Sequence, residues 1–209
     1  MEKTFKLLGL SGAIALLSYS AMVFISPIAY PGYNWMTMAV SELSAAGSPS
    51  QTLANQLNAL FGPCSVLLSI TLVFIASRKS KVKLFRLGIT LFTLMEWICA
   101  TGYEMFPWVS GVDKLIFQNF MHLAVTVAVV VLSLSSLILL AISSKRVGLK
   151  SLGLWAIIAL IAMLIGPIGT SFMPPSVFGL FERFSTFSAV VFNAILGVYL
   201  FKGRFTSII

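Results

Sequence analysis

The sequence predicts an all-α integral membrane protein, a single domain formed by a bundle of six transmembrane helices. Of its 209 residues, 58% are hydrophobic and only 10% are charged, whereas a soluble domain carries about 25% charged residues. The mean hydropathy is +1.00. The apolar residues gather into six stretches, each near the roughly 20 residues that a spanning helix needs: residues 7–29, 54–77, 87–106, 117–142, 152–172 and 181–201.

The first stretch follows two lysines, Lys3 and Lys6, and so has the charge pattern of a secretory signal peptide. Its apolar run is longer than the core of a signal peptide, which has about 7–15 residues. We therefore expect this stretch to stay in the protein as its first transmembrane helix.

The positions of the basic residues predict the orientation of the helices. Of the 14 lysines and arginines, the chain termini hold two each, the segment 78–86 holds five and the segment 143–150 holds three. Lys114 and Arg183 are the other two. Because basic residues are retained on the cytoplasmic side, we expect a multi-pass protein of the cell membrane, plasma or inner, with both termini cytoplasmic and three hairpins facing outwards. This placement also explains the net charge of +8 without a nucleic-acid partner.

The first outer loop carries helix-start signals. Asn34 is expected to cap a short helix over residues 35–46, which would lie on the membrane surface and end at Gly47. Residues 48–51 read Ser-Pro-Ser-Gln and have the form of a capping box. We therefore expect the second spanning helix to begin there, before its purely apolar part.

Polar and small residues form a stripe at helical spacing on the second, fourth and sixth stretches. Such residues favour close helix packing in lipid, so we expect these three helices to meet at the centre of the bundle and the other three to face lipid. The stripes are either packing seams only or the lining of a wet cavity. They consist of Asn55, Asn58, Gly62, Ser65 and Ser69; of Asn119, His122, Thr126 and Ser133; and of Glu182, Thr186, Ala189, Asn193 and Gly197.

Titratable residues recur at one spacing in the three outer hairpins. Glu42, His122 and Glu182 each follow a proline by 15 residues. The spacing is either chance or the trace of one helical hairpin repeated three times, as in many transport folds. If the hairpins are equivalent, the three side chains lie at a similar depth around one centre, with Glu104 or Arg183 close by.

Arg183 directly follows Glu182, but neighbours in a helix point in different directions and do not pair. We expect the guanidinium to form an ion pair with Glu42 or Glu104, which would hold the hairpins in register. The alternative is that it binds an anionic head group or a carboxylate of a ligand. Asp113 is the remaining acid near the outer side.

Glu96 stands in the middle of the third apolar stretch. At that depth a carboxyl group must be protonated, paired or facing water. Thr93, Glu96 and Tyr103 share one helical face, which we expect to point inward. The polar residues expected at a similar depth, and so the candidate partners, are Asn58, Ser65 and Asn193.

His122 is the only histidine, and the sequence leaves three roles open for it. It could relay protons or bind a ligand, serve only as a structural hydrogen-bonding group, or join Glu42 and Glu182 in a metal site. The metal site is the least favoured of these, and no cofactor is expected. The sequence has no Gly-x-Ser-x-Gly elbow and no phosphate-binding glycine loop, so whether the protein is an enzyme stays undecided.

The sequence resembles the integral membrane proteins of domain-of-unknown-function family 998 in three places. These are residues 41–49 (Ser-Glu-Leu-Ser-Ala-Ala-Gly-Ser-Pro), His122 early in the fourth helix, and Glu182-Arg183 at the start of the sixth. The resemblance covers nearly the whole chain and implies six helices and no assigned activity. More loosely, a serine-rich outer loop that ends in Gly and Pro is similar to that of six-helix membrane proteins of the Frag1/DRAM/Sfk1 type. Those proteins are associated with lipid- and autophagy-related roles, but too few positions match to carry the roles over.

Together these observations predict a binding or transport role, with membrane lipids as partners. A small polar ligand, an ion or a lipid head group would enter an outward-facing cavity between the second, fourth and sixth helices. The alternatives are an intramembrane lipid-modifying enzyme that uses His122 and a glutamate as acid and base, and a membrane scaffold in which the polar residues serve packing only. The sequence leaves the oligomeric state open. The residues expected to line the cavity are Glu42, Glu104, His122, Glu182 and Arg183.

Overall fold

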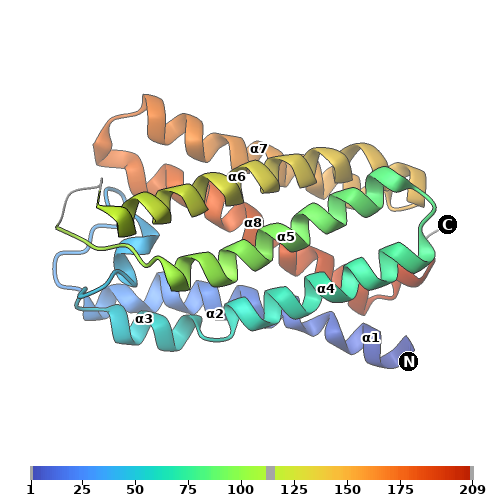
Figure 1. Ribbon diagram of the computed structural model, residues 1–209, viewed down its shortest axis with the longest axis horizontal. Coiled ribbons are helices and arrows are strands. Elements are labelled where there is room, and N and C mark those ends of the chain that lie inside the picture. Colours follow the sequence, from blue (N-terminus) through green and yellow to red (C-terminus); the bar gives the residue numbers. More distant parts are fainter. Residues whose placement is uncertain (1, 112–115, 208–209) are drawn as a thin grey trace.

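The computed structural model describes residues 2–111 and 116–207, and the chain winds through them as a bundle of long helices (Figure 1). Asp113 and Lys114 lie outside the described residues. Within this part, the α-helices are α1 (Glu2–Leu8), α2 (Leu10–Ile25), α3 (Gln51–Asn58), α4 (Phe61–Lys79), α5 (Lys83–Met105), α6 (Phe117–Ser143), α7 (Lys150–Phe172) and α8 (Phe178–Phe201). The short 3-10 helices are η1 (Ser26–Ala29), η2 (Val40–Leu43), η3 (Ser144–Val147), η4 (Pro175–Val177) and η5 (Arg204–Ser207).

Six helical segments of the described chain are long and apolar enough to cross a membrane, which confirms the predicted number of spans. Two of them contain two α-helices each: α1 continues into α2, and α3 continues into α4. The segments run over Lys3–Ala29, Gln51–Lys79, Lys83–Met105, Phe117–Val147, Lys150–Phe172 and Pro175–Phe201.

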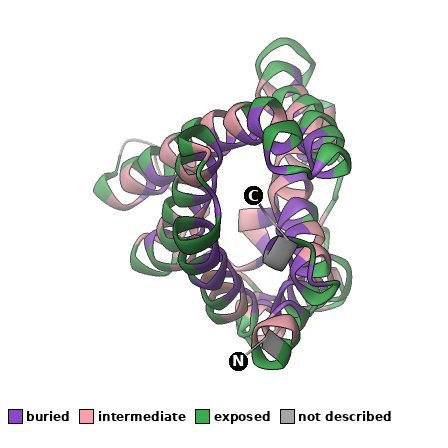
Figure 2. Cartoon of the chain, turned by 90° about the vertical axis from the view of Figure 1, so that its right-hand side faces the viewer, coloured by how far each residue is buried: buried purple, intermediate pink, exposed green. Residues whose placement is uncertain are grey.

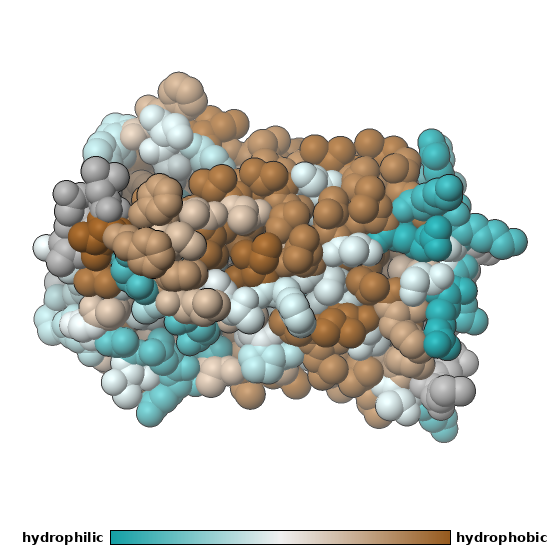
Figure 3. Space-filling model, viewed as in Figure 1, coloured by the Kyte–Doolittle hydropathy of each residue, from teal (hydrophilic) through white to brown (hydrophobic). Residues whose placement is uncertain are grey.

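The two ends of the bundle differ in charge. The start of α1, the end of α8 and the turns that join α4 to α5 and α6 to α7 lie together at the right of Figure 1, and polar side chains gather there on the surface (Figure 3). We call this the basic end, because both basic turns lie there. The opposite end, here called the loop end, holds η1, η2, η4 and the described residues between α5 and α6. Between the two ends the surface in this view is mostly apolar, as lipid contact requires (Figure 3).

The spanning helices form a closed ring in the order α2, α4, α5, α6, α7 and α8, and α8 completes it by packing against α2 (Figure 2). Short connections make consecutive helices antiparallel neighbours. The prediction that the second, fourth and sixth spans all meet at the centre is therefore wrong for α6, which packs mainly against α5 and α7. The stripes themselves do point inward at Ser65, Asn119 and Asn193, which are buried, whereas Asn55 is exposed.

Two glycines bring the first and last spans together. A Cβ on Gly9, between α1 and α2, would overlap the carbonyl oxygen of Gly197 on α8, and a Cβ on Gly197 would overlap the carbonyl oxygen of Gly9. Small residues of this kind are typical where helices approach closely in lipid. This crossing closes the ring near the basic end.

The interior of the ring toward the basic end is apolar. Phe92 of α5 and Phe192 of α8 meet edge to face, with ring centroids 5.6 Å apart, and neither side chain is more than 1% exposed. Leu68 of α4 and Leu137 of α6 are equally buried in the same cluster. These side chains fill the bundle between its middle and its basic end.

The surface helix expected over residues 35–46 is wrong. The Asn34 side chain does accept a hydrogen bond from the Met36 N–H group, at 3.0 Å, but only a turn follows, and then the 3-10 helix η2. The backbone groups that a longer helix would pair internally are bonded to α8 instead: the Met38 carbonyl accepts from Arg183, and the Val40 N–H donates to Glu182. Tertiary hydrogen bonds therefore replace the helical ones here.

Candidate functional site

Arg183, in the first turns of α8, fastens the first outer loop to that helix. Its guanidinium donates to the carbonyl oxygens of Trp35 (2.7 Å), Met38 (3.2 Å) and Gly179 (2.7 Å), and to the hydroxyl of Tyr33 (2.6 Å). The planar fork of arginine suits several acceptors at once. The expected ion pair with Glu42 or Glu104 is therefore wrong: the hydrogen bonds of this cation go to three carbonyls and a phenol.

Tyr33 completes this contact as both donor and acceptor. Its hydroxyl accepts from Arg183 and donates to the carbonyl oxygen of Ala39 at 3.0 Å. Burial raises the pKa of Tyr33, although the nearby positive charge of Arg183 opposes the shift. The phenol is thus held in its neutral form, the form that can donate to a carbonyl.

The carboxylates Glu182 and Glu42 also serve the first outer loop. Glu182 accepts a hydrogen bond from the Val40 N–H group at 2.7 Å, and Glu42 accepts one from the hydroxyl of Ser110 in the second outer loop. The two carboxyl groups are close enough to interact electrostatically. The structure thus brings Glu42, Glu182 and Arg183 of the predicted cluster to one region at the loop end.

His122 lies in a separate environment. Its Nδ1 atom is 2.8 Å from the carbonyl oxygen of Phe106, which can only accept, so Nδ1 carries the proton. The imidazole packs against the rings of Tyr103 and Trp108, with centroids 5.0 Å and 5.6 Å away, and is 7% exposed. The expectation that His122 sits among carboxylates is therefore wrong: its neighbours are aromatic rings, and its hydrogen bond ties α6 to the end of α5.

The remaining member of the predicted cluster, Glu104, is exposed on the last turn of α5. In the part of the chain that the structure describes, no group of three histidine, cysteine or acidic side chains could hold a metal ion. The candidate metal set of His122, Glu42 and Glu182 is not brought together, because the imidazole bonds to Phe106, the Glu182 carboxylate to Val40 and the Glu42 carboxylate to Ser110.

A second polar cluster, here called the interior cluster, lies in the middle of the bundle. Glu96 of α5 is 2% exposed, and its carboxyl group interacts with the hydroxyl of Ser65 on α4. Asn193 of α8 donates through Nδ2 to the same hydroxyl at 3.0 Å. Both Ser65 and Asn193 are 0% exposed. Three helices therefore contribute one polar side chain each to a dry site.

The interior cluster leaves one acceptor unused. The Oδ1 atom of Asn193 is buried and has no hydrogen-bond partner among the described residues. Asn58, the third predicted partner of Glu96, also has a buried Oδ1 without a partner there, but it stands at the end of α3, nearer the loop end. A buried polar atom without a partner is uncommon in a native protein, so Asn193 can accept a further donor, such as a proton-bearing group or water.

Polar side chains connect the interior cluster with the loop end. On α5, Cys99 and Tyr103 follow Glu96 at one-turn steps, and the Tyr103 hydroxyl donates to Thr126 of α6 at 3.2 Å. On the other side, the Tyr19 hydroxyl of α2 interacts with Thr186 of α8 and lies within electrostatic range of Tyr103. Thr186 is one turn from Glu182 along α8, so polar side chains occur at intervals between the interior cluster and the loop end.

Sequence reasoning missed Tyr33, Ser110 and Tyr19. Tyr33 and Ser110 bond to partners 150 and 68 residues away, so no local pattern marks them. Tyr19 stands between Ser18 and Ser20 in the first apolar stretch and looks like a packing residue. One signal could have identified it. Its expected depth in the membrane matches that of Tyr103, which lies on the inward face of the third span.

Comparison with protein families gives one match. The model of the family described as "Protein of unknown function (DUF998)" matches residues 13–199, which is nearly the whole chain. Comparisons with curated protein sequences and with solved structures found no match. The resemblance of the sequence to domain-of-unknown-function family 998 is thereby confirmed.

Proposed function

Because the chain belongs to the DUF998 family, whose function is unknown, we propose its function from the geometry of the interior cluster. We infer that the protein binds and releases a proton at Glu96 as part of a membrane-transport role. The observation that carries this proposal is a carboxyl group, 2% exposed in mid-span, whose side-chain contact is the neutral hydroxyl of Ser65. Ionisable residues at such depth mark ion pathways and proton relays in membrane proteins.

The surroundings of Glu96 favour its neutral form at rest. The described residues supply a hydroxyl and an amide around it, and no cation within ion-pair distance. An isolated carboxylate in a dry interior is costly, so the group keeps its proton until water or a rearrangement of the helices reaches it. The unused Oδ1 of Asn193 provides an acceptor for that rearrangement.

The proton is exchanged with the loop end. On that side four polar side chains follow one another: Cys99, Tyr103, Tyr19 and Glu182. On the basic side, Phe92 and Phe192 close the interior. A site that is polar toward one face and sealed toward the other is one of the two states that an alternating-access carrier needs.

The alternatives lose support from the same geometry. An intramembrane enzyme that uses His122 and a glutamate as acid and base would need the two side chains within hydrogen-bond reach of one substrate, but the imidazole bonds to Phe106. If Glu96 never exchanges its proton, the protein is a membrane scaffold instead.

Infrared difference spectroscopy tests the proposal on protein inserted into vesicles in one orientation. A protonated carboxyl group in apolar surroundings gives a carbonyl band that shifts in heavy water. We expect this band in the parent protein and in Glu104→Gln, which removes an exposed glutamate of the same helix, and its loss in Glu96→Gln. The band should respond to the pH at the loop end and not to the pH at the basic end.

Three results would overturn the proposal. The band could be absent from the parent protein, it could persist in Glu96→Gln, or it could stay unchanged from acidic to strongly alkaline buffer. The last result would mean that the carboxyl group serves packing only and would favour the scaffold.

A further inference from the structure

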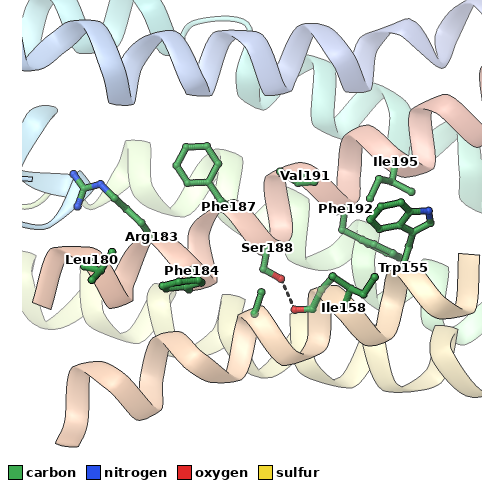
Figure 4. Close-up of a pocket in the computed structure, with 12 residues that line it drawn as sticks. Trp155, Ile158, Leu180, Arg183, Phe184, Phe187, Ser188, Val191, Phe192 and Ile195 are labelled. Atoms are coloured by element: carbon green, nitrogen blue, oxygen red, sulfur yellow. Dashed lines mark hydrogen bonds between the residues drawn. The ribbon is translucent and has the colours of Figure 1, made fainter. Parts of the chain in front are cut away.

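A groove runs between α7 and α8 on the lipid-facing side of the ring (Figure 4). It has a volume of about 390 Å³, and its lining is almost entirely apolar. Ile158 of α7 and Phe184 and Val191 of α8 line it and are between 38% and 46% exposed, so they face the membrane. Its floor is fixed by the Ser188 hydroxyl, which donates to the Ala159 carbonyl oxygen at 2.6 Å across the two helices (Figure 4).

The groove continues into a second cavity at the basic end. This cavity has a volume of about 440 Å³ and shares two lining residues, Trp155 and Ile195, with the first. Its walls are mixed. Beside apolar side chains they include Ser151 and Tyr199, whose hydroxyls are hydrogen-bonded at 2.7 Å, and the basic residues Lys202 and Arg204. The two cavities together are thus apolar along most of their length and carry Lys202 and Arg204 at the basic end. Arg183 lines the groove toward the loop end, but its guanidinium is hydrogen-bonded to the first outer loop.

We propose that this groove binds one anionic glycerophospholipid of the leaflet at the basic end. Lys202 and Arg204 contact its phosphate, and one acyl chain lies between α7 and α8. The complementarity of charge identifies the head group: two exposed cations suit a phosphate that carries no cationic substituent, whereas a choline head group would add a third positive charge.

The dimensions of the groove agree with an acyl chain. From Leu180 to Ile195 the apolar part extends 15 residues along α8, or about 22 Å at 1.5 Å per residue. The hydrocarbon core of a bilayer is about 30 Å thick, and each leaflet supplies about half of that thickness. The groove is therefore longer than one leaflet is thick and can hold a whole acyl chain. At the junction Trp155, 43% exposed, lies where the apolar part meets the basic cavity.

The site also explains why the lipid would be held rather than exchanged freely. The acyl chain of the lipid contacts a fixed surface on two packed helices, and its head group contacts two positive charges at once. In the part of the chain that the structure describes, neither the Lys202 nor the Arg204 side chain is engaged in a hydrogen bond. Both are therefore available to a phosphate.

The test is a lipid titration of the purified protein in a neutral detergent, read out by native mass spectrometry and by the thermal unfolding midpoint. The probes are dioleoyl phosphatidylglycerol, dioleoyl phosphatidylcholine and glycerol phosphate. We expect one phosphatidylglycerol to stay bound and to raise the unfolding midpoint, with little effect of the other two. Protection by glycerol phosphate equal to that of the lipid, or equal binding of both lipids, would overturn the proposal.

Two pairs of variants locate the site. The double variant Lys202→Gln/Arg204→Gln should weaken phosphatidylglycerol binding about tenfold or more, while Lys79→Gln/Lys81→Gln, which removes two charges at the same end of the bundle, should not. Val191→Trp fills the groove and should also weaken binding, while Val131→Trp, on the lipid-facing side of α6, should not. An equal loss in either control would overturn the proposal, because binding would then follow net charge or general destabilisation.

Phospholipid binding in the groove does not depend on the proton site. Glu96→Gln should keep the bound phospholipid, and Lys202→Gln/Arg204→Gln should keep the infrared band of Glu96. The two proposals can therefore fail separately.

Discussion

The amide of Asn193 on α8 donates to the hydroxyl of Ser65 on α4 at 3.0 Å, although 128 residues separate them in the chain. This bond crosses the interior of the bundle and places both side chains beside Glu96. It connects two helices that otherwise pack mainly with other neighbours.

A double-mutant cycle measures the strength of that bond. We expect Asn193→Ala and Ser65→Ala to be coupled by about 0.6 kcal/mol and by no more than about 1.7 kcal/mol, the range of interhelical hydrogen bonds in membranes. The measurement is reversible unfolding in mixed micelles. As a control, Asn193→Ala combined with Ser135→Ala, whose hydroxyl bonds to its own helix, should be additive. Coupling that is equal in both cycles would contradict the direct bond.

Arg183→Lys should release the first outer loop from α8. Lysine keeps the charge but cannot form the planar fork that reaches three carbonyls and Tyr33. We expect a loss of about 2 kcal/mol in the free energy of unfolding and faster amide hydrogen exchange over residues 33–40. Glu104→Gln, at the same end of the bundle, is the control and should change neither. Unchanged exchange in Arg183→Lys would mean that the charge alone holds the loop.

Tyr33 should make stability depend on alkaline pH. Its pKa is raised by burial, so the folded protein keeps the phenolic proton where the unfolded chain loses it. The stabilising contribution is complete below the ordinary tyrosine pKa of about 10 and is lost as the pH rises through the higher folded value. Tyr33→Phe should remove this part of the decline in thermal unfolding midpoint above about pH 10. The assignment fails if Tyr33→Phe and the parent protein decline in parallel.

Gly197→Ala should separate the first span from the last. The added methyl group would overlap the backbone of Gly9, which cannot move aside as a side chain can. We expect a loss of about 1–3 kcal/mol, the usual effect of overpacking, measured by unfolding in mixed micelles. The matched substitution Gly62→Ala brings a methyl group 3.2 Å from the Cβ of Ala100, a side-chain atom, and should cost less. The reverse order would contradict a backbone contact at Gly9.

The basic end predicts which side of the membrane each end of the bundle faces. A cysteine introduced at Ser176, exposed in η4 at the loop end, should react with an impermeant maleimide added outside intact cells. A cysteine at Lys81, exposed in the turn between α4 and α5, should react only after the membrane is opened. Labelling of the Lys81 position in intact cells would reverse the orientation that the positive-inside rule predicts.

The sequence alone determined the membrane class, the six spans and the grouping of the basic turns at one end. These properties depend on hydropathy and on charge along the chain, which are local quantities. It also predicted that the stripes at Ser65, Asn119 and Asn193 point inward, because the period of a helix fixes which residues share a face.

Which polar residues meet depends instead on how the helices pack. Glu42, His122 and Glu182 share a spacing, yet each side chain bonds to a different partner: His122 to Phe106, Glu182 to Val40 and Glu42 to Ser110. Arg183 was expected to find a carboxylate and instead bonds to carbonyls, because the loop beside it folds as turns with free backbone acceptors. Neither set of contacts is determined by the sequence near the residue itself. Each depends on which helices become neighbours in the ring, and in lipid that order is set by close packing and by the length of the connections rather than by the polarity of any one segment.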